Sequence, residues 1–194
     1  MNFYKWNVAT RLALGFVSTL VLLAVVAAVS DHSMRRTSND TDALLSEKLK
    51  NERLIGEWKT IIAVNVPRTQ AAGLTSDPAT QRMFEGAIAA NSRRATELLD
   101  ILSSSLQDPT AKSLYAAALE QRKIYPASRA TALKEKAAGN LERANAYFNH
   151  ELANAAKAYL GAVDKLALHQ QSLITAIGAD IYNRSRQARW RSSH

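Results

Sequence analysis

Residues 141–177, LERANAYFNHELANAAKAYLGAVDKLALHQQSLITAI, repeat small or apolar side chains at steps of three and four positions. An α-helix has about 3.6 residues per turn, so side chains at these steps lie along one face of a helix. A stripe of this length predicts packing in a helical bundle or coiled coil. The stripe consists of Leu141, Ala144, Phe148, Leu152, Ala155, Tyr159, Val163, Leu166, Gln170, Leu173 and Ile177.

Helix-breaking signals divide the chain upstream of this stripe. The pairs Asp77-Pro78 and Asp108-Pro109 each predict a helix start, because Asp is a favoured N-cap and Pro is tolerated at the first helical position. A third break is expected at Gly139. We therefore expect helices over residues 31–74, 78–107, 109–138 and 141–185.

The first two of these segments show the same helical spacing. Asn65 and Asn91 interrupt the two stripes, so each either sets the register between helices or lines a pocket, and we favour register. The stripes are Leu54, Trp58, Ile61 and Asn65 in the first segment, and Phe84, Ile88, Asn91, Ala95, Leu98 and Leu102 in the second.

The segment lengths and the short connections predict the fold class. We expect an all-α protein, an antiparallel up-down-up-down four-helix bundle with long first and fourth helices. At a rise of about 1.5 Å per residue, the outer helices reach about 65 Å and the inner ones about 45 Å. The first and last helices should therefore project together beyond the four-helix part.

Composition excludes several classes of protein. The 194 residues include no cysteine, which excludes disulfides, thiolate metal sites and a cysteine nucleophile. The net charge of +8 suggests a polyanionic partner, but +2 of it falls in residues 1–30 and +4 in residues 184–194. Residues 31–183 carry 19 basic and 17 acidic side chains, so a nucleic-acid partner is disfavoured.

The N-terminal apolar run predicts a membrane anchor. Residues 12–29 carry no charge, and as a helix they reach about 27 Å, close to the thickness of a bilayer core. Because Lys5 and Arg11 precede the run, residues 1–11 should be cytoplasmic and the segment after the span external. A cleaved signal peptide and a buried soluble helix are the alternatives.

This topology defines the expected domains. Residues 12–30 form the transmembrane helix, residues 31–185 a periplasmic four-helix bundle, and residues 186–194 a basic tail. With the bundle antiparallel, the tail returns to the membrane surface, where Trp190 and its neighbouring arginines suit the interface. We expect a bacterial inner-membrane protein with a single N-terminal span.

No pattern for catalysis is present in the sequence. The four histidines show no metal-ligand spacing, and we find no glycine-rich phosphate loop, nucleophile elbow or paired acid motif. The chain is therefore expected not to be an enzyme, and neither a metal nor a cofactor is expected.

Two short motifs support a family resemblance. The anchor reads Thr10-Arg11-Leu12-Ala13-Leu14-Gly15-Phe16, and Asn65-Val66-Pro67-Arg68-Thr69 lies near the end of the first long helix. With the long–short–short–long bundle, they resemble the ligand-binding module of methyl-accepting chemotaxis proteins. The resemblance covers almost the whole chain, and the second motif is similar to the Asn-x-x-Arg of that family.

The resemblance implies a dimeric periplasmic sensor that binds small molecules at its membrane-distal end and signals through a second span, a HAMP linker and a cytoplasmic coiled coil. The sequence departs from that plan, because it stops at His194 before a second span. We expect either a fragment of a receptor or a single-pass binder. The departure puts the signalling output in doubt, but not ligand binding.

A cluster in the third segment suggests a binding site. Arg122, Tyr125 and Arg129 follow the spacing i, i+3 and i+7, so they share one helix face. Two guanidinium groups can converge on a di- or tricarboxylate, and Pro126 should kink the helix there. The alternative is that both arginines are solvated and that Tyr125 lies at the edge of the bundle.

Further candidates lie at compatible heights in the predicted bundle. Arg68 is proposed from the family motif, with a surface role as its alternative. Tyr159 falls in the apolar stripe, so a core position competes with a ligand contact. Ser92 and Thr96 complete the predicted site, whereas Arg93 and Arg94 are interpreted as a solvated pair.

We therefore expect a chemoreceptor module for a small organic acid, first of all a di- or tricarboxylate, bound by Arg122, Tyr125, Arg129, Arg68, Tyr159, Ser92 and Thr96. One alternative is an anchored bundle that only dimerises or docks a partner protein. Another is the sensor module of a histidine kinase, for which the same bundle serves.

Overall fold

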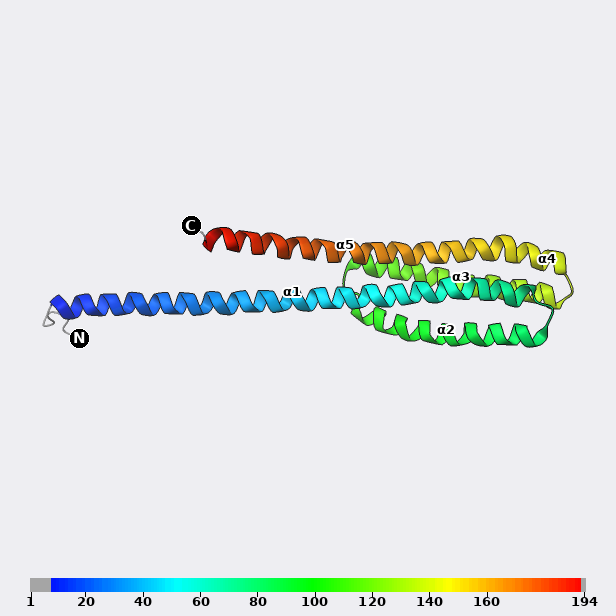
Figure 1. Ribbon diagram of the computed structural model, residues 1–194, viewed down its shortest axis with the longest axis horizontal. Coiled ribbons are helices and arrows are strands. Elements are labelled where there is room, and N and C mark those ends of the chain that lie inside the picture. The colour runs from blue at the N-terminus through cyan, green and yellow to red at the C-terminus, as the bar shows by residue number, and fades with distance from the viewer. Residues whose placement is uncertain (1–7, 193–194) are drawn as a thin grey trace. The chain divides into compact units, whose positions relative to one another are not determined.

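The computed structural model describes the backbone of residues 8–192 and the side chains of residues 16–26 and 41–187. Every regular element among these residues is helical, and no strand occurs in the described backbone, which confirms the all-α class (Figure 1). The elements are α1 (Val8–Leu74), α2 (Pro78–Ser105), α3 (Pro109–Ala137), α4 (Leu141–Ala146), a π-helical segment η2 (Tyr147–Glu151) and α5 (Leu152–Ser192).

The chain divides into two compact units, Met1–Leu44 and Leu45–His194. In the first unit, the described apolar side chains of residues 16–26 are exposed, including Phe16, Leu22 and Val26. No helix has a stretch long and apolar enough to cross a membrane within the described residues. The side chains of residues 1–15 and 27–40, which include both ends of the predicted span, lie outside the described part of the chain.

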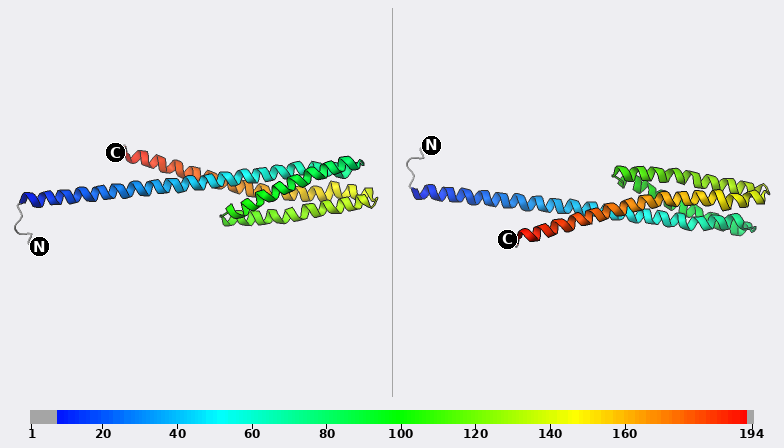
Figure 2. Two further views of the ribbon diagram at one scale, coloured as in Figure 1. Left: turned by 90° about the horizontal axis from the view of Figure 1, so that it is seen from below. Right: turned by 90° about the horizontal axis from the view of Figure 1, so that it is seen from above.

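The second unit is a helical bundle, and Figure 2 shows α2, α3 and α5 running beside the later part of α1. The contacts between α1 and α2 pair earlier residues of α1 with later residues of α2, as expected for antiparallel helices. Between α1 and α2, Asn51 lies at Ser105 and Asn65 at Asn91. Between α3 and α5, the Tyr125 ring packs on Tyr159.

Both predicted helix starts are confirmed by their caps. The Asp77 carboxylate accepts hydrogen bonds from the backbone N–H groups of Ala79 and Thr80, at 3.2 and 2.9 Å. The Asp108 carboxylate accepts one from Ala111 at 2.7 Å. At the third break, Gly139 adopts a φ of 81°, a left-handed conformation that is accessible to glycine at little cost.

The stripe that predicted the last helix is buried from Ala144 to Gln170, whereas Leu141 at its start is exposed. The expected single helix over residues 141–185 is nevertheless interrupted, because Tyr147–Glu151 is π-helical. The π-helical turn places Phe148 directly over Gly73 of α1, where a Cβ atom would overlap the Phe148 ring. This close packing joins the last helix to the end of the first.

Four aromatic rings form the centre of the core, which we call the aromatic layer: Trp58, Tyr115, Tyr125 and Tyr159. Trp58 is fully buried, and its ring lies 6.2 Å from Tyr115 and 6.0 Å from Tyr159. Tyr125 follows at 6.3 Å from Tyr159. Small residues make room for these rings, because Ala111, Ala118 and Ala132 occupy buried positions of α3 at steps of seven around Tyr125.

Candidate functional site

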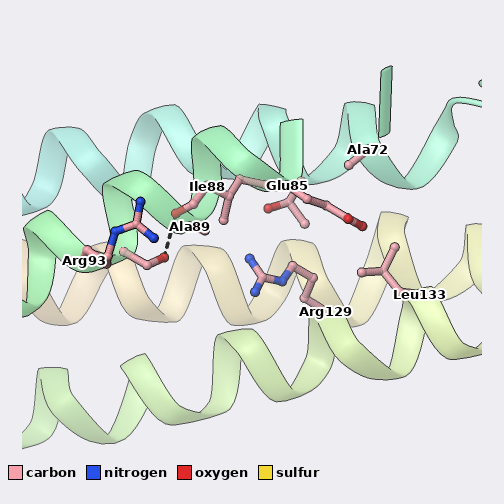
Figure 3. A pocket seen from close by; sticks show the side chains of 9 residues that line it. Ala72, Glu85, Ile88, Ala89, Arg93, Arg129 and Leu133 are labelled. Atoms are coloured by element: carbon pink, nitrogen blue, oxygen red, sulfur yellow. Dashed lines mark hydrogen bonds between the residues drawn. The ribbon is translucent and has the colours of Figure 1, made fainter. Parts of the chain in front are cut away.

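A pocket of about 460 Å³ lies between the end of α1, the first half of α2 and the later part of α3 (Figure 3). We call it the α2–α3 pocket. Two other hollows, of about 780 and 610 Å³, are lined by none of the predicted site residues. The α2–α3 pocket is lined by Thr69, Ala72, Glu85, Ile88, Ala89, Ser92, Arg93, Arg129 and Leu133.

Two arginines from different helices face this pocket. Arg93 on α2 and Arg129 on α3 both line the pocket, and Figure 3 shows the Arg129 side chain in the space between the helices. Among the described residues, neither guanidinium group forms a hydrogen bond or an ion pair. Arg94, next to Arg93, differs: it binds Glu57 at 2.7 Å and Glu97 at 2.9 Å. The pocket therefore holds two guanidinium groups with free donors.

The rest of the lining is mixed in character. Ile88 and Leu133 supply apolar surface, and Glu85 supplies a carboxylate. One Glu85 oxygen accepts a hydrogen bond from the Gln81 amide at 2.9 Å. The hydroxyl of Ser92 donates to the Ile88 carbonyl at 2.8 Å, so it is already engaged. A ligand here would meet guanidinium donors, a carboxylate and aliphatic walls.

Beneath the pocket, Thr69 joins the lining to the aromatic layer. Its hydroxyl is buried and donates to the Asn65 carbonyl at 2.8 Å. The nearby Tyr125 hydroxyl is buried without a hydrogen-bond partner among the described residues. Burial raises the pKa of Tyr125, and the adjacent Thr69 and Arg129 side chains act in the opposite direction. Arg129 therefore lies close enough to act on the Tyr125 phenol from the pocket.

The structure separates the three residues predicted on one face of the third helix. Arg129 lines the pocket, whereas Arg122 donates a hydrogen bond to the Thr96 hydroxyl at 2.7 Å. Tyr125, only 6% exposed, packs in the core instead of at the bundle edge. Arg122 and Arg129 are seven residues apart, and because a helix turns by about 100° per residue they lie on the same side of α3. They are nevertheless about 10 Å apart along the helix axis, so their side chains contact different neighbours.

The other predicted residues have different surroundings. Ser92 lines the pocket. Tyr159 is a core residue whose hydroxyl accepts a hydrogen bond from the Trp58 indole N–H at 2.8 Å, and burial raises its pKa to about 12. Arg68 is half-buried on α1 and does not belong to the pocket lining. Thr96 is exposed and engaged by Arg122.

Sequence reasoning missed two charged residues of the pocket. Arg93 and Arg94 are both exposed, as expected for a solvated pair, but Arg94 forms ion pairs with Glu57 and Glu97, whereas Arg93 lines the pocket. Glu85 was not considered at all. Glu85, Ala89 and Arg93 follow at steps of four, which places them on one face of α2, so a charge-based reading of that helix would have found both.

The predicted role of Asn65 and Asn91 as a polar contact between helices is confirmed. The Asn91 amide donates to the Asn65 side-chain oxygen at 2.9 Å, joining α1 to α2. The structure adds a second such pair that was not predicted, in which the Ser105 hydroxyl donates to the Asn51 side-chain oxygen at 2.6 Å. Both pairs set the register of α2 on α1.

Residues 5–184 match the family described as a four helix bundle sensory module for signal transduction. The chain belongs to this family. The match spans nearly the whole chain and confirms the resemblance to the sensory module of chemotaxis receptors. No curated protein sequence matches this chain significantly. Because the family is a sensory module, the α2–α3 pocket is a candidate site for a signal molecule.

Proposed function

We propose that this sensory module recognises a small organic acid in the α2–α3 pocket, and that it does so for bacterial chemotaxis. The observation that carries the proposal is the pair Arg93 and Arg129, whose guanidinium groups face one pocket without partners. Guanidinium groups bind carboxylates through paired, charge-assisted hydrogen bonds. Two of them can hold one carboxylate from both sides or one at each end of a di- or tricarboxylate.

The pocket is connected to the helices that would report binding. Thr69 and Ala72 belong to α1, and Gly73 beside them packs under Phe148 just before α5. The antiparallel contacts support an up-down-up-down order in which α1 and the last helix are neighbours. A ligand that binds one arrangement of these helices more tightly shifts the population toward it.

Membrane attachment through residues 12–30 is part of the proposal. Its support is the exposure of apolar side chains in residues 16–26, which water disfavours and lipid accepts. Residues 1–11 would then be cytoplasmic, the bundle periplasmic, and residues 186–194 close to the inner membrane. Extraction of membranes with carbonate should leave the chain in the pellet, and release into the supernatant would contradict the anchor.

We also propose a homodimer, with no nucleic-acid partner. The groove of about 780 Å³ between α1 and α5 has exposed Leu168 in its lining, which suits contact with a second copy. Sedimentation of the full chain in detergent tests this assembly, and a monomer at all concentrations would exclude it.

Calorimetry on the full chain in detergent tests the ligand class. The probes are hexanoate, succinate, malate and citrate, which carry one, two or three carboxylates. We expect heat of binding from at least one of them. Arg129→Ala and Arg93→Ala should each weaken it by about tenfold or more, because each removes a charged hydrogen-bond donor.

The matched control is Arg82→Ala. Arg82 is an exposed arginine of the same helix α2 and is not part of the pocket lining. Its removal should leave the affinity unchanged, which separates a specific contact from a general effect of net charge. Equal losses in all three variants would contradict a site at Arg93 and Arg129.

Two alternatives have distinct outcomes. An anchored bundle that only docks a protein partner predicts no heat from any organic acid and no effect of the arginine variants. The sensor module of a histidine kinase would share the pocket and the ligand, and would differ in the output domain. We favour the chemotaxis sensor because the sequence motifs resemble that family, and the match to a sensory module for signal transduction is consistent with it.

A further inference from the structure

We infer that the α2–α3 pocket selects acids with one carboxylate and a positive group at the opposite end, with Glu85 as the residue that sets this preference. The inference rests on the proposed function and narrows its ligand class to ω-amino acids. It disfavours the di- and tricarboxylates expected from the sequence.

Charge is distributed unevenly along the pocket. Glu85 precedes Arg93 by eight residues of α2, a distance of about 12 Å along the helix axis. Figure 3 shows the Glu85 side chain extending toward Ala72 and Leu133, whereas Arg93 lies at the other end of the view. The pocket thus has a guanidinium end, at Arg93 and Arg129, and a carboxylate end at Glu85.

The carboxylate of Glu85 remains available to a ligand. Gln81 occupies one of its oxygens, and Glu85 forms no ion pair among the described residues. A carboxylate can accept about four hydrogen bonds, so several positions stay open for an ammonium group. Like charges disfavour a shared site, so a second ligand carboxylate at this end would be repelled.

Lys136 is a cation close to this end, because it contacts Gln81, the hydrogen-bond partner of Glu85, but it does not offset the repulsion of a second ligand carboxylate. Its ammonium group donates to the carbonyls of Ala72 and Thr75, at 3.2 and 2.6 Å, and to the Gln81 amide oxygen at 3.3 Å. An ammonium group has three donors, so all three are in use. A second ligand carboxylate would find no free donor there.

The wall between the two ends is aliphatic. Ile88 on α2 and Leu133 on α3 line the pocket, together with Ala72 and Ala89. A methylene chain buries its surface against such side chains, whereas hydroxyl or carboxylate groups in the middle of a ligand would lose hydrogen bonds to water. The lining therefore fits a ligand with two charged ends and an apolar spacer.

Three compounds with six carbon atoms each test the inference: hexanoate, 6-aminohexanoate and adipate. They differ only at the far end, which is neutral, positive or negative. Calorimetry on the full chain in detergent should rank 6-aminohexanoate first and adipate last. Because Glu85 is exposed to solvent, we expect about threefold between successive compounds.

Variants at position 85 provide the decisive comparison. Glu85→Gln should remove the difference between 6-aminohexanoate and hexanoate, and Glu85→Lys should reverse the order so that adipate binds best. Glu97→Gln is the matched control, since Glu97 is an exposed glutamate of the same helix outside the pocket. It should leave the order unchanged.

The outcomes separate the two levels of the proposal. Adipate binding as tightly as 6-aminohexanoate to the unaltered chain, or an order unaffected by Glu85→Gln, would overturn the inference and leave an organic-acid site intact. Failure of every carboxylate to bind would overturn both the inference and the ligand class of the proposed function.

Discussion

The aromatic layer and the adjacent α2–α3 pocket differ in whether their polar side chains have hydrogen-bond partners. In the aromatic layer the Trp58 indole donates to Tyr159, and the Tyr115 hydroxyl donates to the Leu99 carbonyl at 2.9 Å; the buried Tyr125 hydroxyl, beside the pocket, is the exception, with no partner among the described residues. In the pocket Arg93 and Arg129 have no hydrogen-bond partner among the residues whose side chains are described. A buried polar group is costly when unpaired, whereas an exposed one is served by water. The aromatic layer therefore stabilises the bundle, and the pocket retains unused donors for a ligand.

The neighbours Arg93 and Arg94 show the same difference within one turn of helix. Arg94 is held by Glu57 and Glu97, which raise its pKa, and it joins α2 to α1. Arg93 faces the pocket instead. Two identical side chains thus serve as a surface ion pair and as a candidate ligand contact, and only their direction from the helix separates them. Substitutions in the core should accordingly change stability, and substitutions in the pocket should change binding.

Gly73→Ala should have the largest effect on stability. The added methyl group would overlap the Phe148 ring, and overpacking of this kind costs about 3 kcal/mol. Gly86→Ala is the control, because a Cβ there has no neighbour within 4 Å and the substitution should stabilise α2 by about 0.5–1 kcal/mol. Thermal unfolding followed by circular dichroism compares them, and equal midpoints would contradict close packing at Gly73.

Tyr159→Phe should follow, with a loss of about 2 kcal/mol, because it leaves the buried Trp58 N–H without an acceptor. The exposed Tyr182 provides the control variant Tyr182→Phe, which should leave the unfolding midpoint unchanged. A Tyr159→Phe protein as stable as the unaltered chain would show that the hydrogen bond in the aromatic layer contributes little.

Asp108→Ala should cost about 1 kcal/mol near neutral pH through loss of the α3 cap. The Ala111 N–H and His169, whose Nε2 lies 2.6 Å from the carboxylate, lower the pKa of Asp108 below its ordinary value of 3.8. This stabilisation is therefore present above that value and is lost as the pH falls through the lower, folded-state pKa.

Urea titrations near neutral pH and at about pH 2 should therefore show the stability difference between Asp108→Ala and the unaltered chain shrinking in acid. Asp100→Ala, at an exposed acidic residue of α2 that caps no helix, is the control and should show no such convergence. A difference that persists in acid would assign the effect to something other than the ionised cap.

Arg93→Ala and Arg129→Ala should have the smallest effect on stability, within about 0.5 kcal/mol of the unaltered chain, because neither removes a hydrogen bond or ion pair found in the described part of the bundle. The same unfolding assay measures this, in parallel with calorimetry. A large loss of stability would show that these arginines stabilise the bundle and would argue against their role as free ligand contacts.

Local signals predicted most of the fold. The Asp-Pro pairs predicted the starts of α2 and α3, since a cap depends on residues within one turn. The stripe from Ala144 to Gln170 predicted the buried face of the last helix, because burial on a bundle follows helical period. Both inferences need only neighbouring residues.

The candidate site was predicted less well because it depends on contacts between helices. The pocket combines α1, α2 and α3, and no single helix shows which arginines will find partners elsewhere. Arg122 meets Thr96 of α2, and Arg94 meets Glu57 of α1. With these pairs known, Arg93 and Arg129 are the arginines of the pocket lining, and both keep free donors among the described residues.

The π-helical segment Tyr147–Glu151 has a consequence for the rotational phase of the last helix. Buried residues Ala144, Phe148, Leu152 and Ala156 follow at steps of four, and each such step drifts by about 40° in a regular α-helix. A π turn holds about one extra residue and so absorbs most of this drift. The core face of α5 stays aligned with that of α4, so a one-residue deletion here would turn every side chain downstream by about 100°.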